Sequence, residues 1–281
     1  RFNLKEFVLE YNMIVKKDKI ADNTYSIWFY HPEICNHFMA GQFLILMVTE
    51  NGERIPLTIA DIDKNNSLVR IIFQVVGYTT KLLSELNVND SIYSVLGPLG
   101  NALKLPENTK KVLLVGGGVG VAPLYPKIKE ISIHLKLTAD VVIGARNINL
   151  FILTDEIEKI ANKLYLFTDD GSSGHKGLVT DGIKKAIEDN GNYDICIAIG
   201  PLIMMKVVVE LNKSLNLPTY VSLNPIMLDG TGMCGGCRFL YDNEVKFVCV
   251  DGPIFDGFKV NFDDLMKKNA QYKEYECKLN S

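Results

Sequence analysis

Three cysteines and one aspartate near the end of the chain are spaced like the ligands of a metal centre. Asp229 is followed after four residues by Cys234 and after two more by Cys237, and Cys249 comes eleven intervening residues later. Plant-type [2Fe–2S] sites use the spacing C-x4-C-x2-C with a more distant fourth cysteine. The stretch reproduces that spacing with Asp229 in the first position. A carboxylate carries the charge of a thiolate but is a harder donor, which should alter the potential of a bound cluster.

Glycines are dense around these four residues. The stretch between Asp229 and Cys237 contains Gly230, Gly232, Gly235 and Gly236. Such glycines would let backbone N–H groups turn toward inorganic sulfur. A cysteine-rich zinc site and thiols without any ligand are the alternative interpretations. The glycine density favours the cluster over zinc, because a zinc knuckle rarely needs so many glycines in so short a loop.

A second glycine-rich stretch, GGGVGVAP at residues 116–123, follows a short apolar segment. Glycines directly after a buried strand permit a tight turn and a close backbone approach. The N-terminus of a following helix offers free N–H groups and a partial positive charge to a pyrophosphate. The spacing is not GxGxxG, and a simple turn that needs positive φ is the alternative. The position between an apolar strand and a helical pattern favours a dinucleotide site.

Composition excludes several classes of protein. The 281 residues predict about two domains, and a hydrophobic content of 47% is ordinary for a globular chain. The net charge of −3 argues against nucleic-acid binding, because no basic excess is available to neutralise phosphates. No apolar run approaches the ~20 residues that cross a bilayer, and no basic-then-apolar leader opens the chain. We therefore expect a cytoplasmic protein without a membrane span.

The first hundred residues read as short β segments separated by turn residues. The expected strands are Thr24–Tyr30, Gln42–Thr49, Leu68–Val76 and Ser91–Val95, and a helical insert is expected over Thr79–Leu86. Short strands at this spacing predict an antiparallel barrel or sandwich.

Beyond residue 110 the pattern changes to alternating strands and helices, which predicts βαβ units and a parallel sheet. The expected strands are Val112–Val115, Asp140–Ile143, Leu164–Thr168 and Ile195–Ile199; the expected helices are Ala122–Leu135, Asp155–Asn162, Asp181–Asp189 and Leu202–Leu215. From about Leu223 the alternation stops and the cysteines appear. We expect three parts, at residues 1–103, 104–222 and 223–281.

Five strings of the sequence together resemble one family. They are residues 53–61 (ERIPLTIAD), 115–125 (VGGGVGVAPLY), 168–180 (TDDGSSGHKGLVT), 233–239 (MCGGCRF) and 250–257 (VDGPIFDG). They are similar to the small (alpha) subunits of NADH-dependent reduced ferredoxin:NADP oxidoreductase, also described as sulfide dehydrogenase subunits, in the ferredoxin–NADP reductase superfamily. The resemblance covers nearly the whole chain, and the Asp-x4-Cys-x2-Cys variant is its most specific mark.

This resemblance implies a multidomain fold with three cofactor sites. An antiparallel β-barrel would bind FAD, a parallel-sheet α/β domain would bind NAD(H), with NADP(H) also open, and a small C-terminal segment would bind the [2Fe–2S] cluster. Electrons from NADH would pass through FAD and the cluster to a larger flavin and iron–sulfur partner of the glutamate-synthase small-subunit type. Through that complex they would reach ferredoxin, an arrangement compatible with electron bifurcation.

The resemblance also implies roles for residues of the barrel. In the flavin motif, Leu57 and Thr58 fill the last two positions after Pro56, and Thr58 would be the catalytic residue, with its hydroxyl against flavin N5. Ile55 stands in the usual arginine position, and Arg54, one residue earlier, would contact the FAD phosphates. The other flavin-binding residues that the resemblance implies are Gly77, Thr79 and Thr80 in a second phosphate-binding turn, and Gly97.

In the α/β part, the resemblance assigns the nucleotide loop to Gly117, Gly118, Gly120 and Pro123. Gly200-Pro201 matches the family's terminal Cys-Gly-Pro, with Ile199 in place of the cysteine. Direct hydride transfer from nicotinamide to flavin needs no protein acid or base, so the missing thiol need not abolish the chemistry.

Three charged residues bear on the choice of nucleotide. Arg146 would pair with a 2′-phosphate and favour NADP, whereas Asp169 and Asp170 would repel one and favour NAD. Both outcomes stay open, and the family leans to NAD(H).

Two rival functions remain. The chain could be the electron-transfer subunit of dihydroorotate dehydrogenase or of another oxidoreductase, although the first ligand position is a cysteine in the dihydroorotate dehydrogenase relatives. It could also be a non-catalytic module that binds zinc and a nucleotide. Copurification of the partner would test the first rival, and a colourless protein containing zinc would indicate the second.

Overall fold

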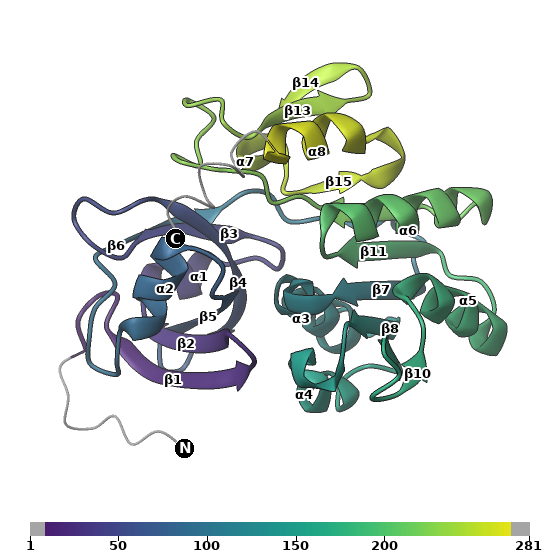
Figure 1. Cartoon of the computed structure of the whole chain (residues 1–281), viewed down its shortest axis with the longest axis horizontal. Coiled ribbons are helices and arrows are strands. Elements are labelled where there is room, and N and C mark those ends of the chain that lie inside the picture. Colours follow the sequence, from purple (N-terminus) through teal and green to yellow (C-terminus); the bar gives the residue numbers. More distant parts are fainter. Residues whose placement is uncertain (1–8, 271–281) are drawn as a thin grey trace.

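A computed structural model describes residues 9–270 of the chain. Figure 1 shows a β-barrel (purple and blue) beside an α/β domain (teal and green), with the C-terminal segment (yellow-green) above the junction between them. Of the six cysteines in the sequence, Cys277 lies outside the described residues.

The barrel is a six-stranded antiparallel sheet in the order β1-β2-β5-β4-β3-β6. Its strands are β1 (Ile14–Ala21), β2 (Thr24–Tyr30), β3 (Phe43–Met47), β4 (Ile55–Asp63), β5 (Leu68–Gln74) and β6 (Ser94–Leu99). A bridge between Met13 and Ser91 closes the two edges. Helix α1 (Pro32–His37) and helix α2 (Tyr78–Glu85) complete this part.

The second sheet has seven strands in the order β10-β9-β8-β7-β11-β12-β15. Its strands are β7 (Lys111–Gly117), β8 (Thr138–Ala145), β9 (Lys163–Thr168), β10 (His175–Lys176), β11 (Ile195–Ile199), β12 (Thr219–Ser222) and β15 (Ile254–Asp256). The connecting helices are α3 (Val121–Lys129), α4 (Thr154–Glu158), α5 (Val179–Asn190) and α6 (Leu202–Ser214). All strands are parallel except β15, which joins β12 antiparallel.

The C-terminal segment is tied to both neighbouring parts. It contains the hairpin of β13 (Arg238–Tyr241) and β14 (Glu244–Phe247), and the helices α7 (Val248–Asp251) and α8 (Phe262–Ala270). Its strand β15 extends the α/β sheet, and the Asn101 amide of the linker after the barrel donates to the Val250 carbonyl at 2.6 Å. The cysteine loop is therefore held against the flank of both domains.

The three-part architecture expected from the sequence is confirmed, and so is the alternation of strands and helices. Six strands were not predicted: β1, β10, β12, β13, β14 and β15. The helix expected over Ala122–Leu135 is α3 followed by one π-helical turn, Glu130–His134. No described helix is long and apolar enough to cross a membrane.

Candidate functional site

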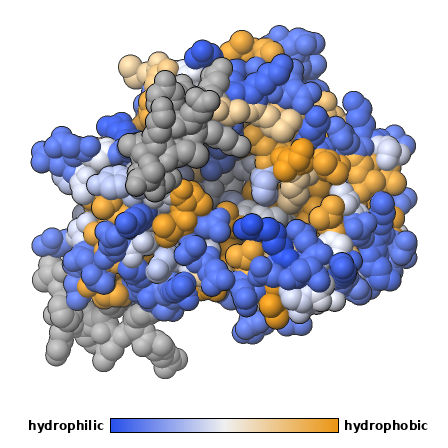
Figure 2. Space-filling model, in the orientation of Figure 1, coloured by the Kyte–Doolittle hydropathy of each residue, from blue (hydrophilic) through white to orange (hydrophobic). Residues whose placement is uncertain are grey.

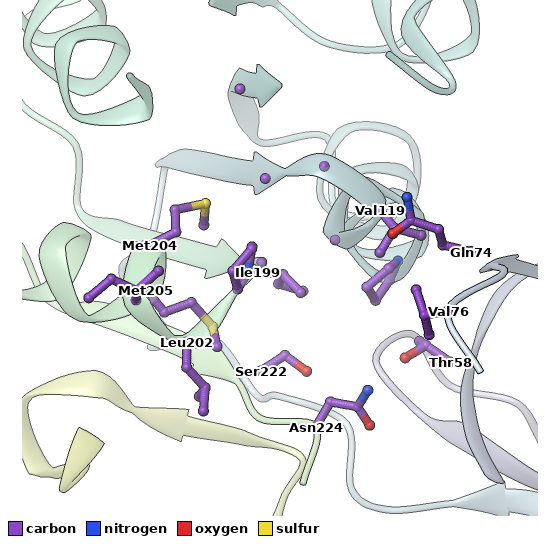
Figure 3. A pocket seen from close by; sticks show the side chains of 18 of the residues that line it. Thr58, Gln74, Val76, Val119, Ile199, Leu202, Met204, Met205, Ser222 and Asn224 are labelled. Atoms are coloured by element: carbon purple, nitrogen blue, oxygen red, sulfur yellow. The ribbon is translucent and has the colours of Figure 1, made fainter. Parts of the chain in front are cut away.

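A cavity of about 960 Å³ lies where the three parts meet. Most of the cofactor-binding residues expected from the sequence line it: Pro56, Leu57, Thr58, Thr80, Gly117, Gly118, Gly120, Pro123, Arg146, Asp169, Gly200 and Pro201. Five lie outside the lining: Arg54, Gly77, Thr79, Gly97 and Asp170. Figure 3 shows Thr58 and Val76 on the barrel side and Ile199, Leu202 and Met204 on the opposite side.

Strand β4 carries Thr58 into the cavity. Thr58 pairs with Phe43 of β3, and both residues line the cavity. The alternation of the strand sends the next residue, Ile59, into the barrel core, where it is fully buried. Thr58 is thus held on a paired strand with its hydroxyl facing the space in which a ligand would lie (Figure 3).

The side-chain hydroxyls at the start of helix α2 are already hydrogen-bonded. The Thr79 hydroxyl donates to Glu53 at 2.7 Å, and the Thr80 hydroxyl accepts from the backbone N–H groups of Val76 and Gly77 at 3.0 Å. These bonds use the two hydroxyls within the turn itself. An anion at this turn would therefore interact with the partial positive charge at the N-terminus of α2.

The glycines after β7 serve different purposes. A Cβ on Gly117 would overlap the Met204 sulfur, and one on Gly120 would lie 2.5 Å from the Ile199 carbonyl oxygen, so both glycines permit close packing. Gly118 has φ +55° and nothing within 4 Å of its Cβ position. Only Gly118 therefore combines a left-handed backbone with open space in the cavity, which is what close approach of a pyrophosphate needs.

Charged residues follow the carboxyl ends of β8 and β9. Arg146 and Asp169 line the cavity, whereas Asp170 turns back to accept the Ser172 N–H at 2.9 Å. Hydrogen bonding to the Ser172 hydroxyl, and then to the Ser172 N–H, holds the pKa of Asp170 below its ordinary value. One cation and one anion therefore face the ligand space at this rim.

Sequence reasoning missed several polar residues of the cavity. Gln74 lies at the end of β5, and Ser222 and Asn224 lie at and just beyond the end of β12. The Asn224 side chain points into the cavity on the same side as Ser222 (Figure 3). The Asn224-Pro225 pair is a turn signal. Because β12 was not predicted, this turn could not be assigned to the end of a strand at the cavity. Apolar side chains gather over α6 in Figure 2. Two apolar residues of α6, Ile203 and Val207, are exposed and line the cavity.

Three of the expected metal ligands, Asp229, Cys234 and Cys237, lie in the loop before β13, and the fourth, Cys249, lies in helix α7. The Cys237 and Cys249 side chains are buried with their sulfurs 3.2 Å apart, and Cys234 is exposed. Burial and the neighbouring Cys237 raise the pKa of the Cys249 thiol to about 12. A metal that binds this thiol must therefore displace its proton.

Asp229 organises the same loop. Its Oδ1 accepts the N–H groups of Thr231 at 2.7 Å and Gly232 at 3.2 Å, and its Oδ2 accepts the N–H of Cys234. These hydrogen bonds, that of Thr231 above all, hold the pKa of the Asp229 carboxyl below its usual value. An ionised carboxylate offers about four lone-pair sites, so Asp229 keeps acceptor capacity beyond these bonds.

The donor set fits an iron–sulfur cluster better than a single metal ion. Within residues 9–270, no three His, Cys, Asp or Glu side chains converge as ligands of one ion. The four candidates instead lie as two neighbouring pairs: the Cys237 and Cys249 sulfurs are in contact, and the Asp229 carboxylate accepts the backbone N–H of Cys234. Two pairs suit two metal atoms, and the donors are soft thiolates with one carboxylate.

Two parts of the chain match family profiles. Residues 114–210 match the oxidoreductase NAD-binding domain, and residues 224–261 match the iron–sulfur cluster binding domain of dihydroorotate dehydrogenase B. The second range contains all four candidate ligands. The match decides between the interpretations of the cysteines in favour of the cluster.

Whole-chain relatives support the same conclusion. The chain is 46% identical, over 94% of its length and 93% of the relative's, to a Thermotoga maritima homologue of the dihydroorotate dehydrogenase B (NAD(+)) electron transfer subunit. It is 33% identical to the Clostridium acetobutylicum electron transfer subunit, over 80% of this chain and 87% of that protein. A solved structure of NADH-dependent reduced ferredoxin-NADP oxidoreductase matches with TM-score 0.89 and 45% identity over 95% of both chains.

Proposed function

Because this chain belongs to the family of dihydroorotate dehydrogenase B electron-transfer subunits and their homologues, we propose that it passes electrons from NADH through FAD and a [2Fe–2S] cluster to a second subunit. The family places it in the ferredoxin–NADP reductase superfamily, with an NAD-binding domain and an iron–sulfur domain. The roles of individual residues and the identity of the acceptor are the parts that we infer.

The observation that carries this proposal is that one cavity touches all three parts of the molecule. Thr58 comes from the barrel, Gly118 from the α/β domain, and Met227 and Pro253 from the C-terminal segment. Met227 is buried two residues before Asp229, and Pro253 follows Cys249 by four. A redox group in the cavity would therefore lie a few residues from the candidate cluster ligands.

FAD supplies, when bound, a hydride acceptor that also releases single electrons, and the cluster supplies a one-electron carrier. We assign Thr58 to donate its hydroxyl hydrogen bond toward flavin N5. The N-terminus of α2 and the backbone at Gly118 would hold the pyrophosphates of FAD and NADH. Because residues of both domains form the cavity wall, they would hold the two ligands close to one another.

We assign Asp229, Cys234, Cys237 and Cys249 as the cluster ligands, with one pair on each iron. The 3.2 Å separation of the Cys237 and Cys249 sulfurs supports a shared iron. The loop hydrogen bonds of Asp229 fix its carboxylate beside Cys234, which supports the other pair.

For the acceptor, we propose a larger flavin and iron–sulfur subunit of the glutamate-synthase small-subunit type, within a complex that couples NADH, NADPH and ferredoxin. The 45% identity over 95% of a chain from such an oxidoreductase supports this acceptor, whereas the 46% identical Thermotoga maritima relative carries the dihydroorotate dehydrogenase B name only as a homologue and the Clostridium acetobutylicum subunit is 33% identical. We place the complex in the cytoplasm, because the five described cysteines are all free, as in reducing compartments.

Anaerobic purification and titration test this function. We expect a yellow-brown protein that contains FAD and iron, whose flavin absorbance is bleached by NADH and whose iron–sulfur EPR signal then appears. A colourless, zinc-containing protein would contradict the proposal. The copurifying partner tests the acceptor: a dihydroorotate dehydrogenase catalytic subunit in place of the proposed larger subunit would replace this assignment.

A further inference from the structure

We propose that two ion pairs between the barrel and the α/β domain, Asp61–Lys129 and Arg70–Glu156, are positioning residues that set the approach of nicotinamide to flavin. The inference rests on the proposed function, since it concerns hydride transfer between the two ligands. Neither pair lines the cavity. Both act through the elements that do.

Each pair joins an element of the flavin wall to an element of the nucleotide wall. Lys129 Nζ on α3 lies 2.6 Å from Asp61 Oδ1 on β4, the strand of Thr58. Helix α3 begins directly after the Gly118–Gly120 turn. A shift of α3 along β4 would therefore move the nucleotide loop relative to Thr58.

The second pair ties the neighbouring strand. Arg70 on β5 contacts both carboxylate oxygens of Glu156 on α4, at 2.8 and 3.1 Å. Two residues beyond Arg70 on the same face, Ile72 lines the cavity, as does Ile152 shortly before α4. Bidentate arginine–carboxylate pairs fix orientation as well as distance.

Arg70 is itself held rigidly. It is only 8% exposed, its Nε donates to Ser26 Oγ at 2.9 Å, and its guanidinium carbon lies 5.5 Å from the Trp28 ring centre. Every part of the guanidinium therefore has a partner. Because Arg70 is fixed in this way, its ion pair with Glu156 holds α4 at a defined position relative to the barrel.

A β-bulge brings the two pairs together. In the pairing of β4 with β5, Ile59 lies opposite Ile71 and Asp61 opposite Arg70, so Ala60 is an extra residue. Without the bulge, Asp61 would share the face of Ile59, which is buried in the barrel core. The bulge instead turns both Ala60 and Asp61 toward the α/β domain, where Ala60 is buried in that domain's core cluster.

The four charges thus form one neutral group across the interface. Asp61 and Arg70 are cross-strand neighbours of opposite charge, and each has its own partner in the α/β domain. Tyr125 of α3 is buried beside them: burial raises its pKa, and the carboxylates of Asp61 and Glu156 raise it further. Loss of one partner leaves an uncompensated charge in a partly buried place.

The test uses Lys129→Met and Glu156→Gln, alone and combined, in the holoprotein. By stopped flow, we expect the rate of flavin reduction at saturating NADH to fall on the order of 10-fold in each variant and 100-fold in the combination. Three properties should stay within about twofold: the rate of reduction by dithionite, the content of FAD and iron, and the dissociation constant of a redox-inert NADH analogue. Misplacement of the nicotinamide relative to the flavin affects the hydride step rather than the binding contacts.

Two further variants separate positioning from general damage. Lys129→Arg keeps the charge and should restore the rate. Lys185→Met breaks a 2.8 Å ion pair with Asp189 that lies wholly within α5, and should leave the rate unchanged. Lys104 is an exposed residue of the linker between the domains. Its cleavage by trypsin, measured without NADH, should accelerate several-fold in the combined variant, because that variant loosens the domain interface. It should not accelerate in Lys185→Met.

The outcomes discriminate. If NADH does not reduce the unmodified protein, the proposed function fails and this inference with it. If NADH reduces the unmodified protein and the combined variant equally fast, or if the combined variant weakens only analogue binding, the inference alone is overturned.

Discussion

The two glycine-rich loops of this protein look similar in the sequence and are built differently. In the loop after β7, added Cβ atoms on Gly117 and Gly120 would meet neighbours at 2.2 and 2.5 Å. In the cysteine loop, the nearest atoms to such positions on Gly235 and Gly236 lie 3.6 Å or farther away. The cysteine loop is also tightly packed at Gly230 and Gly232, where neighbours would lie at 2.6 and 2.8 Å, but it has room around Gly235 and Gly236.

This difference indicates how each site is completed. Packing between β7, β11 and α6 forms the nucleotide loop before any ligand arrives, so a ligand finds a prepared surface. The cysteine loop depends on positive-φ glycines and on the hydrogen bonds of Asp229. Metal bound there would add its binding free energy to the stability of the loop, because the ligands are otherwise held only in part.

The largest effect should come from breaking the less packed loop. Asp229→Ala removes both a ligand and the acceptor of three backbone N–H groups, so we expect iron content and the EPR signal to be lost while FAD is retained. Asp229→Cys should keep a cluster with a shifted potential, because a thiolate restores the charge with a softer donor. Iron analysis and EPR check both.

A matched variant separates the two roles of Asp229. Asp229→Asn retains an oxygen that can accept the N–H groups of Thr231 and Gly232, but it lacks the negative charge. If the residue is a ligand, Asp229→Asn should lose most of its iron as well. Full iron content in Asp229→Ala would show that the cluster is held without this residue.

A substitution in the glycine loop after β7 should impair NADH-dependent reduction and leave the cluster intact. Gly118→Val places a side chain in the open space next to the nucleotide, so we expect flavin reduction by NADH to slow on the order of 100-fold or more, with dithionite reduction and cluster content intact. Gly191 also has positive φ and nothing within 4 Å of its Cβ position, but it lies at the end of α5. Gly191→Val imposes comparable backbone strain and should leave NADH kinetics unchanged, whereas unaltered kinetics in Gly118→Val would overturn the nucleotide site.

Both loops could be recognised from the sequence because each is a local feature of the chain. The Asp229–Cys237 spacing and the strand–glycine–helix order of 112–123 are local, so both could be recognised without a structure. The domain order follows from hydrophobic periodicity, which is also local. Sequence spacing is informative wherever neighbours along the chain are also neighbours in space.

Long-range arrangement could not be predicted in this way. Strand β12 has four residues and is recognisable only by its pairing with β11 and β15, so Asn224 was not assigned to the cavity. The bulge at Ala60 and the alignment of Asp61 with Arg70 depend on register between strands, which no local pattern specifies. The hydrogen bond from the Thr79 hydroxyl to Glu53 joins residues distant in the sequence, and no local pattern indicates it.

The smallest expected effect concerns the rim of the packed site, where Arg146 and Asp169 make opposite demands on the nucleotide. Asp169→Ala should raise the rate with NADPH on the order of fivefold relative to NADH, because an exposed carboxylate opposes a 2′-phosphate by about 1 kcal/mol. Arg146→Ala should lower the rate with NADPH and leave NADH unchanged. Asp170→Ala is the matched control, since that neighbouring carboxylate is outside the cavity lining and bonded to Ser172. If Asp170→Ala shifts the NADPH-to-NADH ratio as much as Asp169→Ala, the rim discriminates by total charge rather than by the side chain that faces the ligand.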